Sequence, residues 1–309
     1  MVKFTSITQP PAIVDQGFSV ALHGKGIDDR TNKTLEQISK FSCNSYEVEY
    51  SRSNMSIDIG ASISLHLREL HELAEHVDCS KAFIDATSLG FVEIIYLIYA
   101  LSKATTKVSV TICYTTPLVY RSTAPTHPEE EEFDLSDSVL SFTGLPIFTY
   151  SHSDSDNNQV SLIALLGFES GRLGKALAQD DNTKFGKMKA LIGVPAFNPG
   201  WENKSISKHL RHFDQLNTQL HYYSSQNPYQ TYEVLSRLYA ENEKIVIASL
   251  GTKPAALACA AFLVNNFERN SRDKNVSVIY DYPSKKIGRT EGIKEVYYYE
   301  LSVGGPIAT

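Results

Sequence analysis

The chain has 309 residues, of which 42% are hydrophobic and 21% are charged, and its formal net charge at pH 7 is -6. This length and composition are typical of a globular protein with a large buried core and one or two domains. The negative net charge argues against an extended basic face for non-specific nucleic-acid binding.

The N-terminal residues lack the apolar core and cleavage site of a signal peptide, and the longest apolar runs are too short to span a bilayer. The four cysteines are scattered, without a C-x-x-C pair. His209 and His212 lie three residues apart, but no carboxylate spacing completes a metal site around them. We therefore expect a cytoplasmic protein that makes no membrane contact and holds neither a metal ion nor a resident cofactor.

Strand and helix signals alternate along residues 1–122. Short apolar runs predict strands at 17–23, 45–50, 81–87 and 107–114, and helical periodicity predicts helices at 34–41, 62–77 and 90–103. This alternation is typical of a mostly parallel sheet with helices on its faces. Two groups of polar residues lie at the ends of these strands and could line a second site, in a pattern too common to be specific: His23, Lys25 and Asp28, and Asp85, Thr87 and Ser88.

The alternation is interrupted between residues 123 and 140. This stretch contains two prolines and the acidic run Glu129–Glu132. Such a sequence offers little apolar surface for burial, so we expect an exposed linker that is the most protease-sensitive internal segment.

The alternation resumes in residues 141–309. We expect strands at 159–166, 188–194, 219–224, 244–248, 276–280 and 296–301, with helices after the first four. The sequence thus predicts an α/β protein made of two Rossmann-like halves with mostly parallel sheets.

The most informative segment is residues 244–267. An apolar run predicts a central buried strand, and the Ala-rich stretch from 255 to 264 predicts a helix buried on most sides. Between them, Gly251 favours a tight turn, Thr252 is a suitable N-cap, and Lys253 adds a positive charge. Free N–H groups at a helix start bind anions, so this turn is a candidate phosphate site, although its spacing is not that of a P-loop.

Ligands of open α/β sheets bind beyond the carboxyl ends of the strands. The side chains there in the second half suit phosphate and ribose groups and include Ser170, Arg172, Ser225 and Asn227. Glu169 ends a strand beside a glycine-rich turn and is the best candidate for a catalytic acid or base. Lys286 and Arg289 form a second, basic candidate for anion binding.

The turn from Leu250 to Pro254 resembles the second signature of the CRISPR-associated Rossmann fold (CARF) sensors, in which a G-[TG]-T-K turn follows a late strand. The turn at 167–170 lies where those sensors carry a short ligand-binding loop, but it lacks their small G-T-S-type residues. We also recognise no effector domain after the resembling region. The resemblance covers residues 155–300. It implies a cyclic oligoadenylate as ligand, a dimer with the ligand on its axis, and a prokaryotic antiviral context.

Three functional hypotheses follow. The first is a nucleotide-binding sensor or interaction subunit, with a nucleotide or oligonucleotide ligand and either a homodimer or a protein complex as its assembly. The second is a nucleotide-processing hydrolase, a glycosidase or phosphodiesterase, that uses Glu169. The third is a structural subunit whose strand–helix turns bind nothing.

Overall fold

The computed structural model describes residues 1–8, 17–121, 133, 135–138, 140–152, 159–178 and 185–305. The chain is an α/β protein that forms two compact units. Unit 1 comprises Met1–Tyr120 and Ile287–Thr309, and unit 2 comprises Arg121–Lys286. In the part of the chain that is described, none of the helices combines the length and the hydropathy that a membrane span requires.

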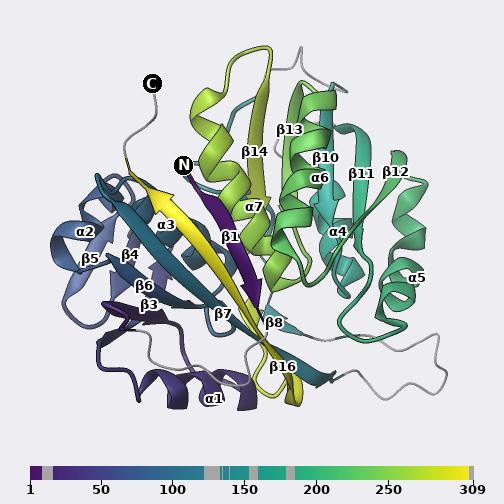
Figure 1. Cartoon of the computed structure of the whole chain (residues 1–309). Coiled ribbons are helices and arrows are strands. Elements are labelled where there is room, and N and C mark those ends of the chain that lie inside the picture. Colours follow the sequence, from purple (N-terminus) through teal and green to yellow (C-terminus); the bar gives the residue numbers. More distant parts are fainter. Residues whose placement is uncertain are drawn as a thin grey trace. The chain divides into compact units, whose positions relative to one another are not determined.

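Unit 2 is built on a six-stranded sheet (Figure 1). Its strands lie in the order β12 (Asn217–Tyr223), β11 (Phe185–Gly193), β10 (Val160–Leu165), β13 (Lys244–Ser249), β14 (Asn275–Tyr280) and β9 (Thr143–Gly144). The first five strands pair in parallel, and β9 pairs antiparallel with β14. Numbered along the chain, the parallel strands have the order 3-2-1-4-5, which is known from doubly wound α/β sheets.

Four helices connect these parallel strands: α4 (Ser170–Leu177), α5 (Trp201–Phe213), α6 (Pro228–Glu241) and α7 (Lys253–Asn266). The chain crosses the sheet in one direction through α4 and α5 and in the other through α6 and α7. Right-handed crossovers therefore place the two pairs on opposite faces. Figure 1 shows α6 and α7 side by side, in agreement with their mutual contacts.

The predictions for the segment around β13 are confirmed. All six residues of β13 are buried, and the strand lies between β10 and β14 with parallel pairing on both sides. Residues 254–263 of α7 are buried without exception. The helix is apolar on every side because it packs against both the sheet and α6.

Unit 1 contains an eight-stranded mixed sheet. The strands lie in the order β1 (Lys3–Thr8), β16 (Thr290–Gly304), β7 (Lys107–Tyr120), β6 (Lys81–Asp85), β2 (Val20–His23), β3 (Asn44–Ser51), β4 (Ser56–Ile59) and β5 (Ile63–His66). Parallel pairing is confined to β7, β6, β2 and β3, and the outer strands pair antiparallel.

The crossover helices of unit 1 are α1 (Asp29–Ile38) and α3 (Phe91–Ser102). They connect β2 to β3 and β6 to β7, which are crossovers in opposite directions, so right-handed connections place the helices on opposite faces. The face under α1 is filled by an apolar cluster that includes Phe18, Ile38 and Phe83.

One predicted helix of unit 1 is wrong. Residues 62–77 form β5, the short 3₁₀ helix η1 (Leu70–Glu72) and the single turn α2 (Leu73–His76). Strands β4 and β5 form a hairpin in which Ile57 faces Leu65. The leucines spaced at helical intervals are buried by this hairpin and by α3 instead of by one continuous helix.

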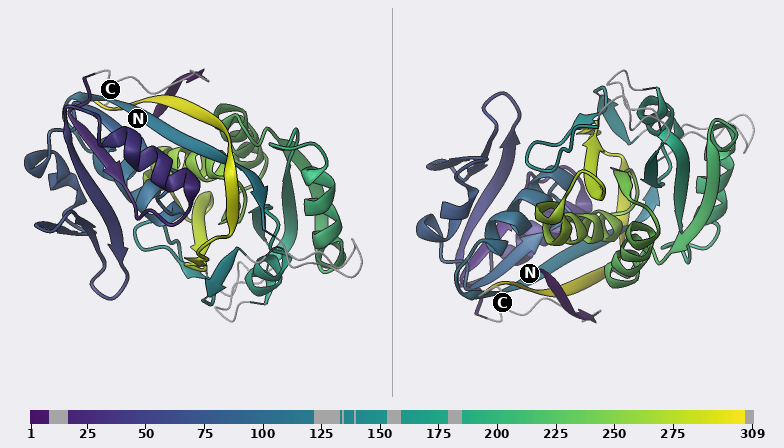
Figure 2. Two further views of the ribbon diagram at one scale, coloured as in Figure 1. Left: turned by 90° about the horizontal axis from the view of Figure 1, so that it is seen from below. Right: turned by 90° about the horizontal axis from the view of Figure 1, so that it is seen from above.

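The C-terminal strand also differs from the expected arrangement. Residues 287–309 were expected in the second half, but β16 pairs antiparallel with β7 over most of its length and so completes the sheet of unit 1 (Figure 2). Most of the predicted linker, residues 123–140, lies outside the described residues. Its described part includes β8 (Ser136–Ser138), which pairs with β15 (Ser284–Lys285) of the same unit.

Candidate functional site

The sheet of unit 2 has a topological switch point between β10 and β13. The chain leaves β10 in one direction along the sheet and leaves β13 in the other, so the helices that follow start on opposite faces. In doubly wound sheets, ligands bind beyond the carboxyl ends of the strands at such a point. Gly251, Thr252 and Lys253 directly follow β13 and lie at this position.

Gly251 is required here for space and not for an unusual backbone conformation. A Cβ atom at this position would lie 2.7 Å from the Tyr223 hydroxyl oxygen, at the end of β12. At Gly167, which follows β10, a Cβ atom would collide with the Leu250 carbonyl oxygen. Gly167 thus lets the loops after the neighbouring strands β10 and β13 approach closely, and Gly251 leaves room for the Tyr223 side chain.

The start of α7 has no side-chain cap. Thr252 occupies the N-cap position in an extended conformation, but its hydroxyl donates to the Ser225 carbonyl oxygen at 3.2 Å and not to the helix. Helix α6 offers a direct contrast, because the Asn227 side chain accepts hydrogen bonds from Tyr229 N at 3.0 Å and Gln230 N at 3.3 Å. Both helices have a proline in their first turn, yet only α6 has its N-terminal N–H groups capped by a side chain.

Glu169 is engaged by its own unit. Its Oε1 accepts from Leu135 N at 3.1 Å and its Oε2 accepts from the Ser136 hydroxyl at 3.1 Å. Arg172 Nη1 lies 3.8 Å from Oε2. The carboxylate therefore ties the segment before β9 to the start of α4, which explains its place at the strand end without a catalytic role.

Arg172 forms a two-pronged ion pair with Asp281, which follows β14. The guanidinium donates from Nε to Oδ2 at 2.7 Å and from Nη2 to Oδ1 at 2.6 Å. Burial alone would lower the pKa of Arg172, but the hydrogen bond and charge of Asp281 raise it well above its usual value. This donor set is already matched by a carboxylate.

The remaining candidates of unit 2 also have internal roles. The Ser170 hydroxyl accepts from Arg211 Nη2 at 3.0 Å, and Ser225 is buried against Gly193. Gly251, Thr252 and Lys253 lie at the switch point of the sheet, and their turn is the candidate anchor for a ligand. The predicted pair Lys286 and Arg289 is divided between the two units.

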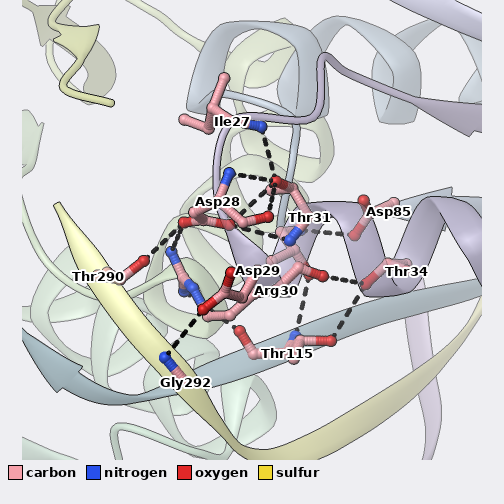
Figure 3. Close-up of polar contacts among 11 residues, drawn as sticks. Ile27, Asp28, Asp29, Arg30, Thr31, Thr34, Asp85, Thr115, Thr290 and Gly292 are labelled. Atoms are coloured by element: carbon pink, nitrogen blue, oxygen red, sulfur yellow. Dashed lines mark hydrogen bonds and ion pairs between the residues drawn. The ribbon is translucent and has the colours of Figure 1, made fainter. Parts of the chain in front are cut away.

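A second polar cluster, in unit 1, surrounds the start of α1 (Figure 3). Asp28 is the N-cap of this helix, and its Oδ1 accepts from Thr31 N at 2.9 Å. Its Oδ2 accepts from Arg30 Nη2 at 2.8 Å and from the Thr290 hydroxyl, on β16, at 2.6 Å. Arg30 also donates from Nη1 to the Thr115 carbonyl oxygen, on β7, at 3.2 Å.

Both charged groups of this cluster are buried: Asp28 is 7% exposed and Arg30 is 3% exposed. Burial alone would raise the pKa of Asp28, but the Arg30 charge and the hydrogen bonds from Thr290 and Thr31 hold it well below its usual range. The carboxylate therefore stays ionised and balances one guanidinium charge.

The sequence analysis listed Asp28 in a pattern too common to define a site, and it did not find the partners of this residue. The spacing of Asp28 and Thr31 is that of a capping box, which marks a helix start and gives no sign of a charged cluster. Thr290 comes from a strand 262 residues away, so its role depends on the pairing of β16 with β7.

No family model, curated protein or solved structure matches this chain. We therefore infer the function from the geometry of these two clusters.

Proposed function

We propose that unit 2 binds a phosphate-bearing ligand of the nucleotide class at the start of α7, and that the chain acts as a nucleotide-binding sensor or interaction subunit. The observation that carries this proposal is the uncapped first turn of α7 at the switch point of the sheet, with Lys253 as its first helical residue.

The physical basis is the charge of the helix terminus. The N-terminal end of a helix carries about half an elementary positive charge, and its first N–H groups point along the axis toward a bound anion. In α6 the Asn227 oxygen takes this position. In α7 a phosphate oxygen takes it, and the Lys253 ammonium adds a point charge.

The hydrolase hypothesis receives less support. A general base must be within reach of the proton that it removes. Both oxygens of Glu169 already accept hydrogen bonds from residues 135 and 136, and Arg172 lies against one of them. A ligand that is held and sensed, without being consumed, fits this arrangement better.

The wider assembly belongs to the same proposal. A nucleotide or oligonucleotide is the ligand class, and a homodimer or a larger protein complex is the assembly in which binding is read out. A role in prokaryotic antiviral defence, in the cytoplasm, follows from the resemblance of the Gly251–Lys253 turn to the CARF signature.

Calorimetric titration with mono-, di- and cyclic oligonucleotides tests the proposal. We expect Lys253→Ala to weaken binding by about one to two decades, because a hydrogen bond to a charged group contributes about 1.5–3 kcal/mol. Lys175→Ala, which removes an exposed lysine near the end of α4, is the matched control and should bind like the wild type.

Two results would contradict the proposal: a wild type that binds none of these compounds, or a Lys253→Ala variant that binds as tightly as the wild type. If the wild type consumes a ligand and Glu169→Gln does not, the hydrolase hypothesis replaces the sensor proposal. Native mass spectrometry of the same samples reports the bound nucleotide and the number of subunits.

A further inference from the structure

The polar cluster of unit 1 includes a second arginine. Arg289 precedes β16 by one residue, next to Thr290, which binds Asp28. Burial lowers the pKa of Arg289, the neighbouring Arg30 lowers it further, and Tyr120 and Asp28 act in the opposite direction. Because Arg30 and Thr290 both donate to Asp28 Oδ2, the chain also brings Arg289, the residue before Thr290, to this carboxylate.

Neither guanidinium has a full set of partners. The Nε atoms of Arg30 and Arg289 are both buried and without a hydrogen-bond acceptor. Within the described part of the chain, no hydrogen bond or ion pair joins Arg289 to a carboxylate. A buried guanidinium N–H without an acceptor carries a desolvation cost of a few kcal/mol that a bound anion would offset.

The two arginines have fewer carboxylates bonded to them than charges. Arg30 and Arg289 contribute two positive charges, and one carboxylate, Asp28, bonds to Arg30. Asp85 accepts instead from Thr87 N and from the Ser88 hydroxyl. The nearby Asp29 is exposed, and its Oδ2 accepts from Gly292 N at 3.4 Å. One further negative charge would balance the two arginines.

We propose that Arg30 and Arg289 bind a singly charged oxyanion, a carboxylate or a phosphodiester, beside the start of α1. The planar guanidinium fork matches both chemistries, and each arginine offers its unpartnered Nε–H. Arg289 is only partly buried, so the anion can reach the site from solvent, whereas Arg30 forms its buried wall. This site is independent of the one proposed at α7.

The test is NMR of the arginine Nε–H groups in the full chain, titrated with acetate and, separately, with dimethyl phosphate at constant ionic strength in chloride. We expect the signals of Arg30 and Arg289 to shift saturably with at least one probe. The probe with the tighter binding identifies the chemical class. Arg68, an exposed arginine of the same unit, should not respond.

Arg289→Gln should weaken binding of the probe by about tenfold or more, because it removes a charge-assisted donor. Arg289→Lys retains the charge but not the fork, and should bind with intermediate affinity. Arg68→Gln is the matched control. Lys253→Ala should leave these shifts unchanged, so the two proposed sites are tested separately.

Saturable shifts in Arg289→Gln with the affinity of the wild type would overturn the proposal, as would the absence of a saturable response to both probes in the wild type. Far-UV circular dichroism confirms that each variant is folded. If Arg289→Gln does not fold, Arg289→Lys is compared with the wild type instead. If these two proteins bind each probe with the same affinity, the guanidinium of Arg289 does not have the proposed role.

Discussion

The two units pair arginines with carboxylates in opposite ratios. In unit 2, one guanidinium, Arg172, faces two carboxylates, Asp281 at 2.6 Å and Glu169 at 3.8 Å. In unit 1, two guanidinium groups share one carboxylate, Asp28. The first cluster therefore has an excess of negative charge and the second an excess of positive charge.

This difference separates a structural cluster from a candidate binding cluster. Arg172 Nε and Nη2 each donate to an oxygen of Asp281, and both oxygens of Glu169 accept hydrogen bonds. These groups of unit 2 are therefore paired within the protein, without a ligand. In unit 1 the two buried Nε atoms still need an acceptor, so the same residue type at an equivalent place has a different consequence.

The largest expected effect is the loss of Asp281. Asp281→Asn would leave the buried Arg172 charge without its matched carboxylate, which typically costs about 3–5 kcal/mol of stability. Denaturant unfolding measures this cost, and Asp273→Asn, at an exposed position, is the control. The double variant Arg172→Met/Asp281→Leu should recover much of the loss. A single variant as stable as the control would show that the pair does not stabilise unit 2.

The corresponding change in unit 1 is Asp28→Asn, which should cost about 2–3 kcal/mol at pH 7 because it removes the partner of Arg30. This effect should depend on pH. The folded-state pKa of Asp28 lies below the unfolded value of about 3.9, so its contribution is complete above that value and is lost as the pH falls through the folded pKa.

The free energy of unfolding of the wild type and of Asp28→Asn, measured from pH 7 down to about pH 3, checks this sign. The gap between the two proteins should narrow at the acidic end. A gap that stays constant, or that widens, would contradict the low pKa assigned to the folded protein.

Much of unit 2 was predictable because its strands are short, apolar and separated by clear breaks. The strand at 244–248 and the buried helix after it follow from a continuous apolar pattern. The structure of the segment at 62–77 was not predictable in this way. Its leucines have a helical spacing, but Leu65 and Leu67 also alternate with polar residues as in a strand. Only the pairing of β4 with β5 decides between the two.

Site chemistry was harder to predict than the fold. The sequence pattern named Arg172 as a candidate ligand-binding residue, and the structure has it in the first turn of α4. Its partner Asp281 is 109 residues away, and a local pattern cannot show that the two bind each other. A local pattern also cannot show the pairing of β16 with β7, because these strands are far apart in the sequence. Long-range pairing decides which polar side chains remain available for a ligand.

Asn227 distinguishes the two helix starts of unit 2. Because its side chain caps α6, Asn227→Ala should cost about 1 kcal/mol of stability. The affinity of Asn227→Ala for nucleotides should stay within about twofold of the wild-type affinity. We expect the reverse for Lys253→Ala, namely little change in stability and a large loss of affinity. Thermal unfolding and calorimetric titration of both variants measure the two effects. A large loss of affinity in Asn227→Ala would restore it as a ligand-binding residue.

The smallest expected effect on stability, and the most direct contrast with Arg172, is that of Arg289→Gln. Substitution of a buried arginine usually destabilises a protein, as we expect for Arg172, because the partner carboxylate is left unpaired. Arg289 binds no carboxylate among the described residues, and its charge repels that of Arg30. Removal of this charge should therefore change the free energy of unfolding by less than about 0.5 kcal/mol, or increase it.

Denaturant unfolding in chloride buffer, without carboxylates or phosphates, measures this change, with Arg68→Gln as the control. When a saturating oxyanion probe is added, the wild type should gain more stability than Arg289→Gln, because a ligand stabilises the folded state according to its affinity for it. A loss of several kcal/mol in chloride alone would show that Arg289 is held by the protein as firmly as Arg172, and that the two clusters do not differ in the way described.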